Sequence, residues 1–182
     1  MIISAQKLRK KNIGVIIKAR RLFDKDTLVT LYYSFIFPYF NYCIHLWGST
    51  YQTYLDKLDI LQKRVHIIAG VKRLEHTLPI FHNLRILTLK HLYKYNIGMF
   101  MYKHHHGWLP SALNIFTKNV EKYDYDSRIA GYVEVPMFHT EFGQKSIKYQ
   151  AVKFWNKIFK FIKVDIKIGT FKKYLKSFLI KQ

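Results

Sequence analysis

The stretch SFIFPYFNYCIHLWGS, from Ser34 to Ser49, lies inside a window that has no charged side chain. This window runs from Thr27 to Leu55 and contains no Lys, Arg, Asp or Glu, although the whole chain has a formal net charge of +20. Aromatic side chains bury large apolar areas when they pack together. The block is therefore expected to form a buried pair of helices, and Pro38 is expected to kink or break the helical path because proline lacks a backbone N–H.

A membrane-spanning helix is the alternative for this block, since about 20 predominantly apolar residues can cross a bilayer. Thr30, Asn41 and His45 lie within it, however, and its tyrosines are scattered instead of gathering at two interfaces. The sequence favours the buried helix pair.

Helical periodicity continues on both sides of the block, which predicts a mainly α fold. We expect a helical bundle over residues 1–110, a loop-rich connection over 111–141 with room for a short β hairpin, and a basic helical region over 142–182. The expected helices lie within the first 23 residues, from a cap at Asp24 or Asp26 to Pro38, from Tyr51 to Ala69, from Thr77, from Thr88 to just before His104, from Phe142 to Ile162, and from a cap at Thr170 onward.

Positive charge is concentrated near the two ends of the chain. The sequence has 31 Lys and Arg against 11 Asp and Glu, and a pI near 10.0. Eleven lysines and a single acid, Asp165, lie between Phe142 and Gln182. Such an excess of positive charge favours binding to a polyanion, either nucleic acid or anionic lipid. The basic residues are interleaved with aromatic residues, which favours nucleic acid. The expected contacts to a phosphate backbone are Lys7, Arg9, Lys10, Lys11, Arg20 and Arg21 near the N-terminus, and Lys145, Lys148, Lys153, Lys172 and Lys173 near the C-terminus.

Catalytic and metal-binding patterns are not evident. The adjacent His104, His105 and His106 would point about 100° apart on a helix, so they cannot converge on one ion, and we expect them to lie at a helix C-terminus instead. No two acids are adjacent, and no glycine-rich phosphate loop occurs. We therefore expect no catalytic residue, metal site or cofactor in this chain.

The cellular environment is only loosely bounded by the sequence. The single cysteine, Cys43, cannot form an internal disulfide, which is compatible with a reducing compartment. The N-terminal segment has its basic residues after the first apolar group and is a poor signal peptide. A nuclear or cytoplasmic location is expected, and secretion is not.

Several short motifs occur in a fixed order along the chain. A tyrosine-rich segment is followed by a Leu-Gln-Lys helix, a leucine-rich segment, a Tyr-x-x-Arg motif, a Trp-Asn block and a terminal Phe-Lys helix. This ordered series, from about Lys7 onward, resembles the C-terminal part of the polymerase protein of non-LTR retrotransposons, the jockey-like LINE reverse transcriptases. The motifs fall at Tyr42–Cys43, Trp47–Gly48, Leu61–Gln62–Lys63, Leu84–Ile86–Leu87–Leu89, Tyr125–Arg128, Ser146–Tyr149, Trp155–Asn156 and Phe171–Lys172.

The resemblance implies a helical thumb and the region just after it, with RNA or an RNA/DNA duplex as the partner. It adds Arg128 as a motif position without an assigned role. The family's palm signature and its metal-binding aspartates do not occur here, so the resemblance implies binding without polymerase activity. The resemblance places the magnesium of the parent polymerase in the palm. It also implies that the chain is a truncated fragment of that polymerase. The missing palm or a second copy of the chain are further expected partners.

Two alternatives from other classes stay open at this stage. An aromatic surface left bare by the missing palm would make the chain a protein interaction module or a self-associating remnant. The terminal Lys/Phe helix also has the composition of a membrane-surface helix, although a membrane partner is disfavoured.

Overall fold

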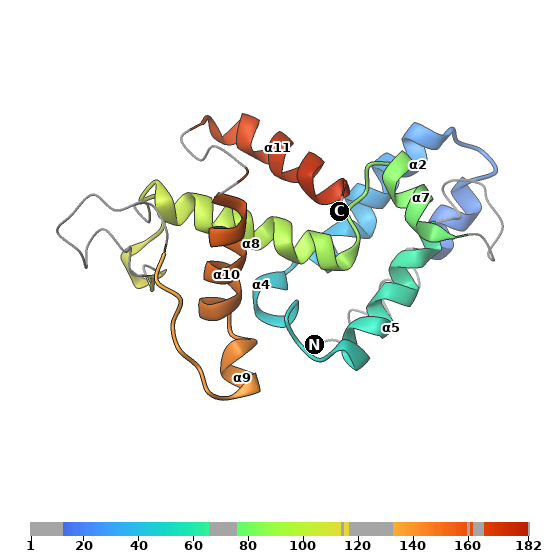
Figure 1. The fold of residues 1–182 in the computed structure, drawn as a ribbon. Helices are drawn as coiled ribbons and strands as arrows, with labels where there is room; N and C mark the ends of the chain where they lie inside the picture. The colour runs from blue at the N-terminus through green and yellow to red at the C-terminus, as the bar shows by residue number, and fades with distance from the viewer. Residues whose placement is uncertain are drawn as a thin grey trace. The chain divides into compact units, whose positions relative to one another are not determined.

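The computed structural model describes residues 13–65, 76–113, 115–116, 133–159, 161 and 166–181 (Figure 1). The described residues are mainly α-helical and include no β-strand, so the predicted fold class is confirmed. The predicted hairpin would fall largely on residues 114 and 117–132, which lie outside the described residues. None of the described helices is both long enough and apolar enough to cross a membrane.

The chain divides into two compact units. Unit 1 comprises Met1–Ile44 and Thr50–Leu92, and unit 2 comprises His45–Ser49 and Tyr93–Gln182. The predicted division at residues 110 and 141 stays a prediction, but the compact units separate at a different point. The reason is that residues 93–105 pack with the C-terminal helices.

Unit 1 contains the break predicted at Pro38. Helix α2 (Lys25–Phe35) ends at the C-cap Ile36, and α3 (Phe37–Asn41) follows with Pro38 in its first turn, where a missing N–H costs nothing. Helix α4 (Ile44–Trp47) comes next and belongs to unit 2 from His45 onward. The uncharged block supplies buried Phe40 and Ile44, as predicted, but Tyr42 and Leu46 are exposed, so only one side of the block is core.

Asp24 is the N-cap of α2, which confirms one of the two predicted caps. Its Oδ2 accepts hydrogen bonds from the backbone N–H groups of Asp26 and Thr27, at 3.2 and 3.4 Å. The Thr27 hydroxyl donates to the other carboxylate oxygen at 2.5 Å. These bonds favour the ionised form, so the pKa of Asp24 is lowered, with the Thr27 hydroxyl as the largest cause.

A buried glutamine joins the remaining elements of unit 1. Helix α5 (Gln52–Gln62) continues as a 3₁₀ turn, η1 (Lys63–Val65), and α7 (Thr77–Asn83) and the start of α8 (Leu89–His105) follow. Gln62 Nε2 donates to Leu87 O at 2.8 Å and to the Tyr32 hydroxyl at 3.3 Å, and its Oε1 accepts from Leu89 N–H at 2.7 Å. The predicted helix from Tyr51 to Ala69 is regular only to Gln62, and residues 66–75 lie outside the described ranges.

Unit 2 is built on the later part of α8, against which α10 (Ile147–Phe159) and α11 (Ile168–Ile180) lie (Figure 1). The Phe171 ring stacks on Tyr102 of α8, with centroids 4.4 Å apart, and lies 6.3 Å from the Trp155 ring of α10. At Gly98 a Cβ would come within 2.7 Å of a methyl group of Leu175, so α8 and α11 approach closely there. A short 3₁₀ turn, η2 (Ser111–Leu113), follows α8.

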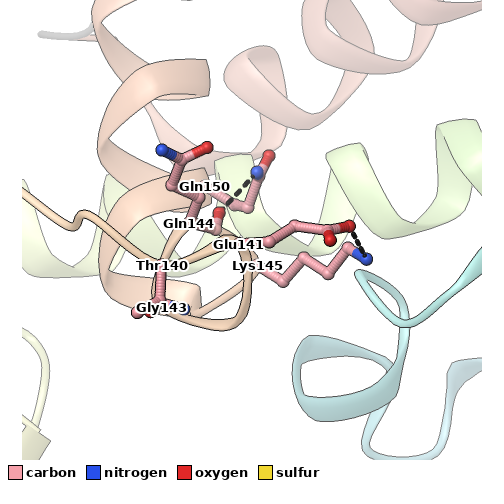
Figure 2. A network of polar contacts seen from close by, with 6 residues as sticks. All are labelled: Thr140, Glu141, Gly143, Gln144, Lys145 and Gln150. Carbon is pink, nitrogen blue, oxygen red and sulfur yellow. Dashed lines mark hydrogen bonds and ion pairs between the residues drawn. The ribbon is translucent and has the colours of Figure 1, made fainter.

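The predicted single helix from Phe142 to Ile162 is wrong. A short helix, α9 (Glu141–Gln144), is separated from α10 at Lys145 and Ser146 (Figure 2). Thr140 caps α9 through a 3.1 Å bond from Gly143 N–H, and Gly143 lies so close to Phe138 that a Cβ would come within 2.7 Å of its ring. This contact with the preceding chain, together with the cap, fixes a separate turn of helix before α10.

Two helix ends also differ from the prediction. Helix α8 continues through His104 and His105, since His104 is buried against the Phe116 ring and does not terminate the helix. Helix α11 begins at Ile168 after the N-cap Lys167, and not at a Thr170 cap. Its first backbone bonds, from Thr170 N–H and Phe171 N–H to Lys167 O at 2.9 and 3.0 Å, form without a side-chain cap.

Candidate nucleic-acid interface

Helix α10 has one apolar face and carries exposed lysines outside its buried contacts. Ala151, Val152, Trp155 and Ile158 are buried, at positions spaced for one side of a helix. Lys153 and Lys157 are exposed on the side opposite these residues, and Lys148 is exposed in the first turn of the helix. Lys148 and Lys153 are among the predicted contacts. Lys157 is not, although its spacing of four residues from Lys153 places it on the same face as that lysine.

Helix α11 has the same organisation. Phe171, Leu175 and Leu179 recur every four residues and are fully buried. Lys172 and Lys173 are exposed, as the predicted contact role requires. Burial of the apolar stripe therefore fixes the orientation of α11 and places these two ammonium groups at the surface of the unit.

One aromatic core fixes α10 and α11 within unit 2. Phe171 of α11 contacts Trp155 of α10, and both rings are fully buried. Asn156 adds a second attachment, because its side chain bonds both backbone groups of Val133, at 3.1 and 2.9 Å. The exposed lysines thus project from helices that cannot shift without disturbing this core.

The predicted contact Lys145 has an ion-pair partner. Its Nζ lies 2.5 Å from Oε1 of Glu141, one helical turn earlier (Figure 2). Lys153, by contrast, lies with its Nζ 5.5 Å above the Tyr149 ring, a contact that leaves the charge uncompensated. Lys145 is therefore a weaker candidate for a phosphate contact than Lys153.

The N-terminal candidates are only partly described. Arg20 and Arg21 are exposed just after a helix over residues 13–19, in unit 1. Lys7, Arg9, Lys10 and Lys11 lie outside the described residues, and so does Arg128.

The two units carry the same formal net charge. Over the full sequence, unit 1 has 15 Lys and Arg against five Asp and Glu, and unit 2 has 16 Lys and Arg against six Asp and Glu, so each unit has a net charge of +10. A phosphate backbone is attracted by the sum of such charges as well as by individual contacts. Net charge therefore does not choose between the units. Unit 2 is the stronger candidate for a polyanion interface because its exposed lysines lie on α10 and α11, which share one buried core.

Unit 1 contains a cavity of about 360 Å³ whose lining includes an acidic side chain as well as lysines. Asp59, Lys63, His76 and Lys90 are among the residues that line it. Burial raises the pKa of Asp59, Lys63 lowers it, and the nearby Asp56 raises it further. A carboxylate beside the lysines disfavours a phosphate group, so this cavity is not part of the candidate interface.

The histidine run does not form a metal site with its described neighbours. Within the ranges that the structure describes, no group of three or more His, Cys, Asp or Glu side chains is arranged to hold an ion. His105 instead lies 5.9 Å from the Trp155 ring and 6.3 Å from Phe159, between ring centroids. The run contributes packing to unit 2.

Trp108 is a residue that sequence reasoning missed. It follows Gly107 after the end of α8, and 55% of its surface is exposed. A glycine just after a helix is a recognised stop signal, but exposure of the next side chain depends on packing that the pattern does not reveal.

Comparison of the chain with protein-family models, with curated proteins and with solved structures finds no match.

Proposed function

We propose that this chain binds RNA or an RNA/DNA duplex through its phosphate backbone, as expected of a thumb-like module of a non-LTR retrotransposon reverse transcriptase. The observation that supports this most is the placement of Lys148, Lys153 and Lys157 on α10 and of Lys172 and Lys173 on α11. All five are exposed, and their two helices share the Phe171–Trp155 core. The ordered sequence motifs supply the choice of partner.

Such contacts act through charge and position, without base recognition. Each lysine that neutralises a phosphate releases condensed counterions, which favours binding and makes it depend on salt. Phosphate contacts fix the register of a protein on a nucleic acid but carry no sequence information. The proposed activity is therefore a grip on template and primer, and no nucleotide addition is proposed for this chain.

Neutralising these lysines tests the proposal. The variant Lys148→Gln/Lys153→Gln/Lys157→Gln should bind an RNA/DNA heteroduplex about tenfold more weakly, and the slope of log affinity against log salt should become shallower by about 1 for each phosphate that a lysine no longer neutralises. Lys172→Gln/Lys173→Gln should also lower the affinity and make the salt slope shallower. Fluorescence anisotropy of a labelled heteroduplex measures both quantities.

The controls use lysines with other surroundings. Lys145→Gln should have the smaller effect because Lys145 is already paired with Glu141. Lys25→Gln/Lys57→Gln removes two exposed charges from unit 1 and should change the affinity less than the α11 pair does. Equal affinity and equal salt slope for all of these variants would contradict the proposal.

A further inference from the structure

The end of α8 has a geometry that depends on Gly107. This residue has φ of +69°, a left-handed conformation that glycine adopts without strain. Its N–H donates to His104 O at 3.0 Å, and the Trp108 N–H donates to Lys103 O at 2.9 Å. These two bonds form a Schellman motif, in which the residue after the glycine folds back on the last helical turns.

The fold-back brings the Trp108 indole onto aromatic neighbours in unit 2. Its ring centroid lies 5.8 Å from Tyr102 in an edge-to-face arrangement, and 5.2 Å from the His106 ring at an interplanar angle of 30°. Tyr102 in turn contacts His106 at 4.3 Å and stacks on Phe171 at the start of α11. The Tyr102 hydroxyl also donates to Ile166 O at 2.5 Å. The indole is therefore held against the end of α8 by Tyr102 and His106, and Tyr102 is itself fixed by its contact with α11.

A purely structural role for Trp108 does not require the exposure that it has. The apolar contact of a Schellman motif occupies one side of the folded-back residue, here against Tyr102. Trp108 remains 55% exposed, whereas Trp155 of the same unit is 0% exposed. A rigidly placed, half-exposed indole in a strongly basic unit has the character of a stacking surface.

We propose that Trp108, flanked by His106, stacks on an unpaired base of a single-stranded nucleic acid. This proposal rests on the proposed function and adds to it a contact with a base. The position favours a base over a phosphate, because the C-terminal end of a helix carries partial negative charge. Lys103, in the last turn of α8, and Lys172, next to Phe171, are exposed and can donate hydrogen bonds to phosphate oxygens of the same strand.

The test compares two probes of equal charge. The first probe is an oligouridine RNA of about 12 nucleotides. The second is an oligomer of the same length in which abasic sugar analogues replace the nucleosides. We expect the wild-type chain to bind the base-bearing probe about tenfold more tightly in anisotropy measurements. Trp108→Ala should abolish this difference and leave binding of the abasic probe unchanged, whereas Trp108→Phe should retain most of it.

A matched control and a second readout complete the test. Phe142→Ala removes another exposed aromatic side chain of unit 2 and should leave the tenfold difference intact. If Trp108→Ala fails to fold by circular dichroism, a Trp47→Phe background leaves buried Trp155 and exposed Trp108 as the only indoles. The base-bearing probe, and not the abasic one, should then quench the exposed emission.

The outcomes separate this inference from the proposed function. Equal wild-type affinity for the two probes, or unquenched indole emission on binding, overturns the stacking site and leaves phosphate binding in place. No binding of either probe, or of the heteroduplex, overturns the proposed function and the stacking site with it.

Discussion

Replacing Phe171 by alanine is expected to lower the free energy of unfolding of unit 2 by about 4 kcal/mol. Phe171 is fully buried and lies between Tyr102, at 4.4 Å, and Trp155, at 6.3 Å, between ring centroids. Truncation leaves a cavity where three helices meet, and the close-packed neighbours can relax only in part. Because Phe171 anchors α11, the variant should also lose affinity for the heteroduplex.

Tryptophan fluorescence in urea measures this change in stability, since Trp47, Trp108 and Trp155 all belong to unit 2. The matched control is Tyr174→Ala, which truncates an exposed aromatic residue on the same helix and should cost no more than about 0.5 kcal/mol. Phe171→Leu should recover much of the stability because it restores most of the volume. The same unfolding midpoint for Phe171→Ala and Tyr174→Ala would show that α11 does not depend on this core.

Gln62→Ala is expected to destabilise unit 1 by about 3 kcal/mol. The side chain is buried and satisfies Leu87 O and Leu89 N–H, at 2.8 and 2.7 Å. Its removal leaves both backbone groups without this partner in an interior where water is scarce, and an unsatisfied buried polar group costs far more than an exposed one. The Tyr32 hydroxyl loses a bond as well.

Urea denaturation followed by far-ultraviolet circular dichroism tests the Gln62 prediction. Gln52→Ala is the control at the other end of the same helix, since the Gln52 side chain donates to the exposed Asp56 carboxylate, at 2.8 Å. Its expected cost is no more than about 0.5 kcal/mol. Equal costs for the two variants would mean that the buried network adds little to unit 1.

Local signals in the sequence are sufficient to predict several elements. The Asp24 cap and the break at Pro38 follow from bonding rules that involve only a few neighbouring residues. The stripe of Phe171, Leu175 and Leu179 also follows from spacing alone. Such features are predictable because the causes lie within one helical turn or one periodic face.

Other elements depend on contacts between distant residues. The break between α9 and α10 arises from the approach of Phe138 to Gly143, which does not disturb the helical period of the sequence. Gln62 reads as a surface residue in a helix, yet it is buried because Leu87 and Leu89 bring their backbone groups to it. The boundary between the units is not predictable either, since it depends on the packing of Tyr102 and Gly98 against α11.

The candidate interface shows the same distinction. Exposure of Lys153, Lys172 and Lys173 follows from their places outside the apolar stripes of α10 and α11. The pairing of Lys145 with Glu141 is a local feature too, because a spacing of four residues brings the two side chains together. The exposure of Trp108 is not readable from the sequence, because it depends on how the Schellman motif places the indole against Tyr102.

The measurement that tests the central claim most directly is a salt titration of wild-type binding to a labelled RNA/DNA heteroduplex, with helicity checked in the same buffer. If the five exposed lysines of α10 and α11 contact phosphates, log affinity should fall linearly with log salt between about 50 and about 200 mM, with a slope of about −4. Binding that is unchanged over this range, or a folded chain that does not bind at the lowest salt, would contradict the claim.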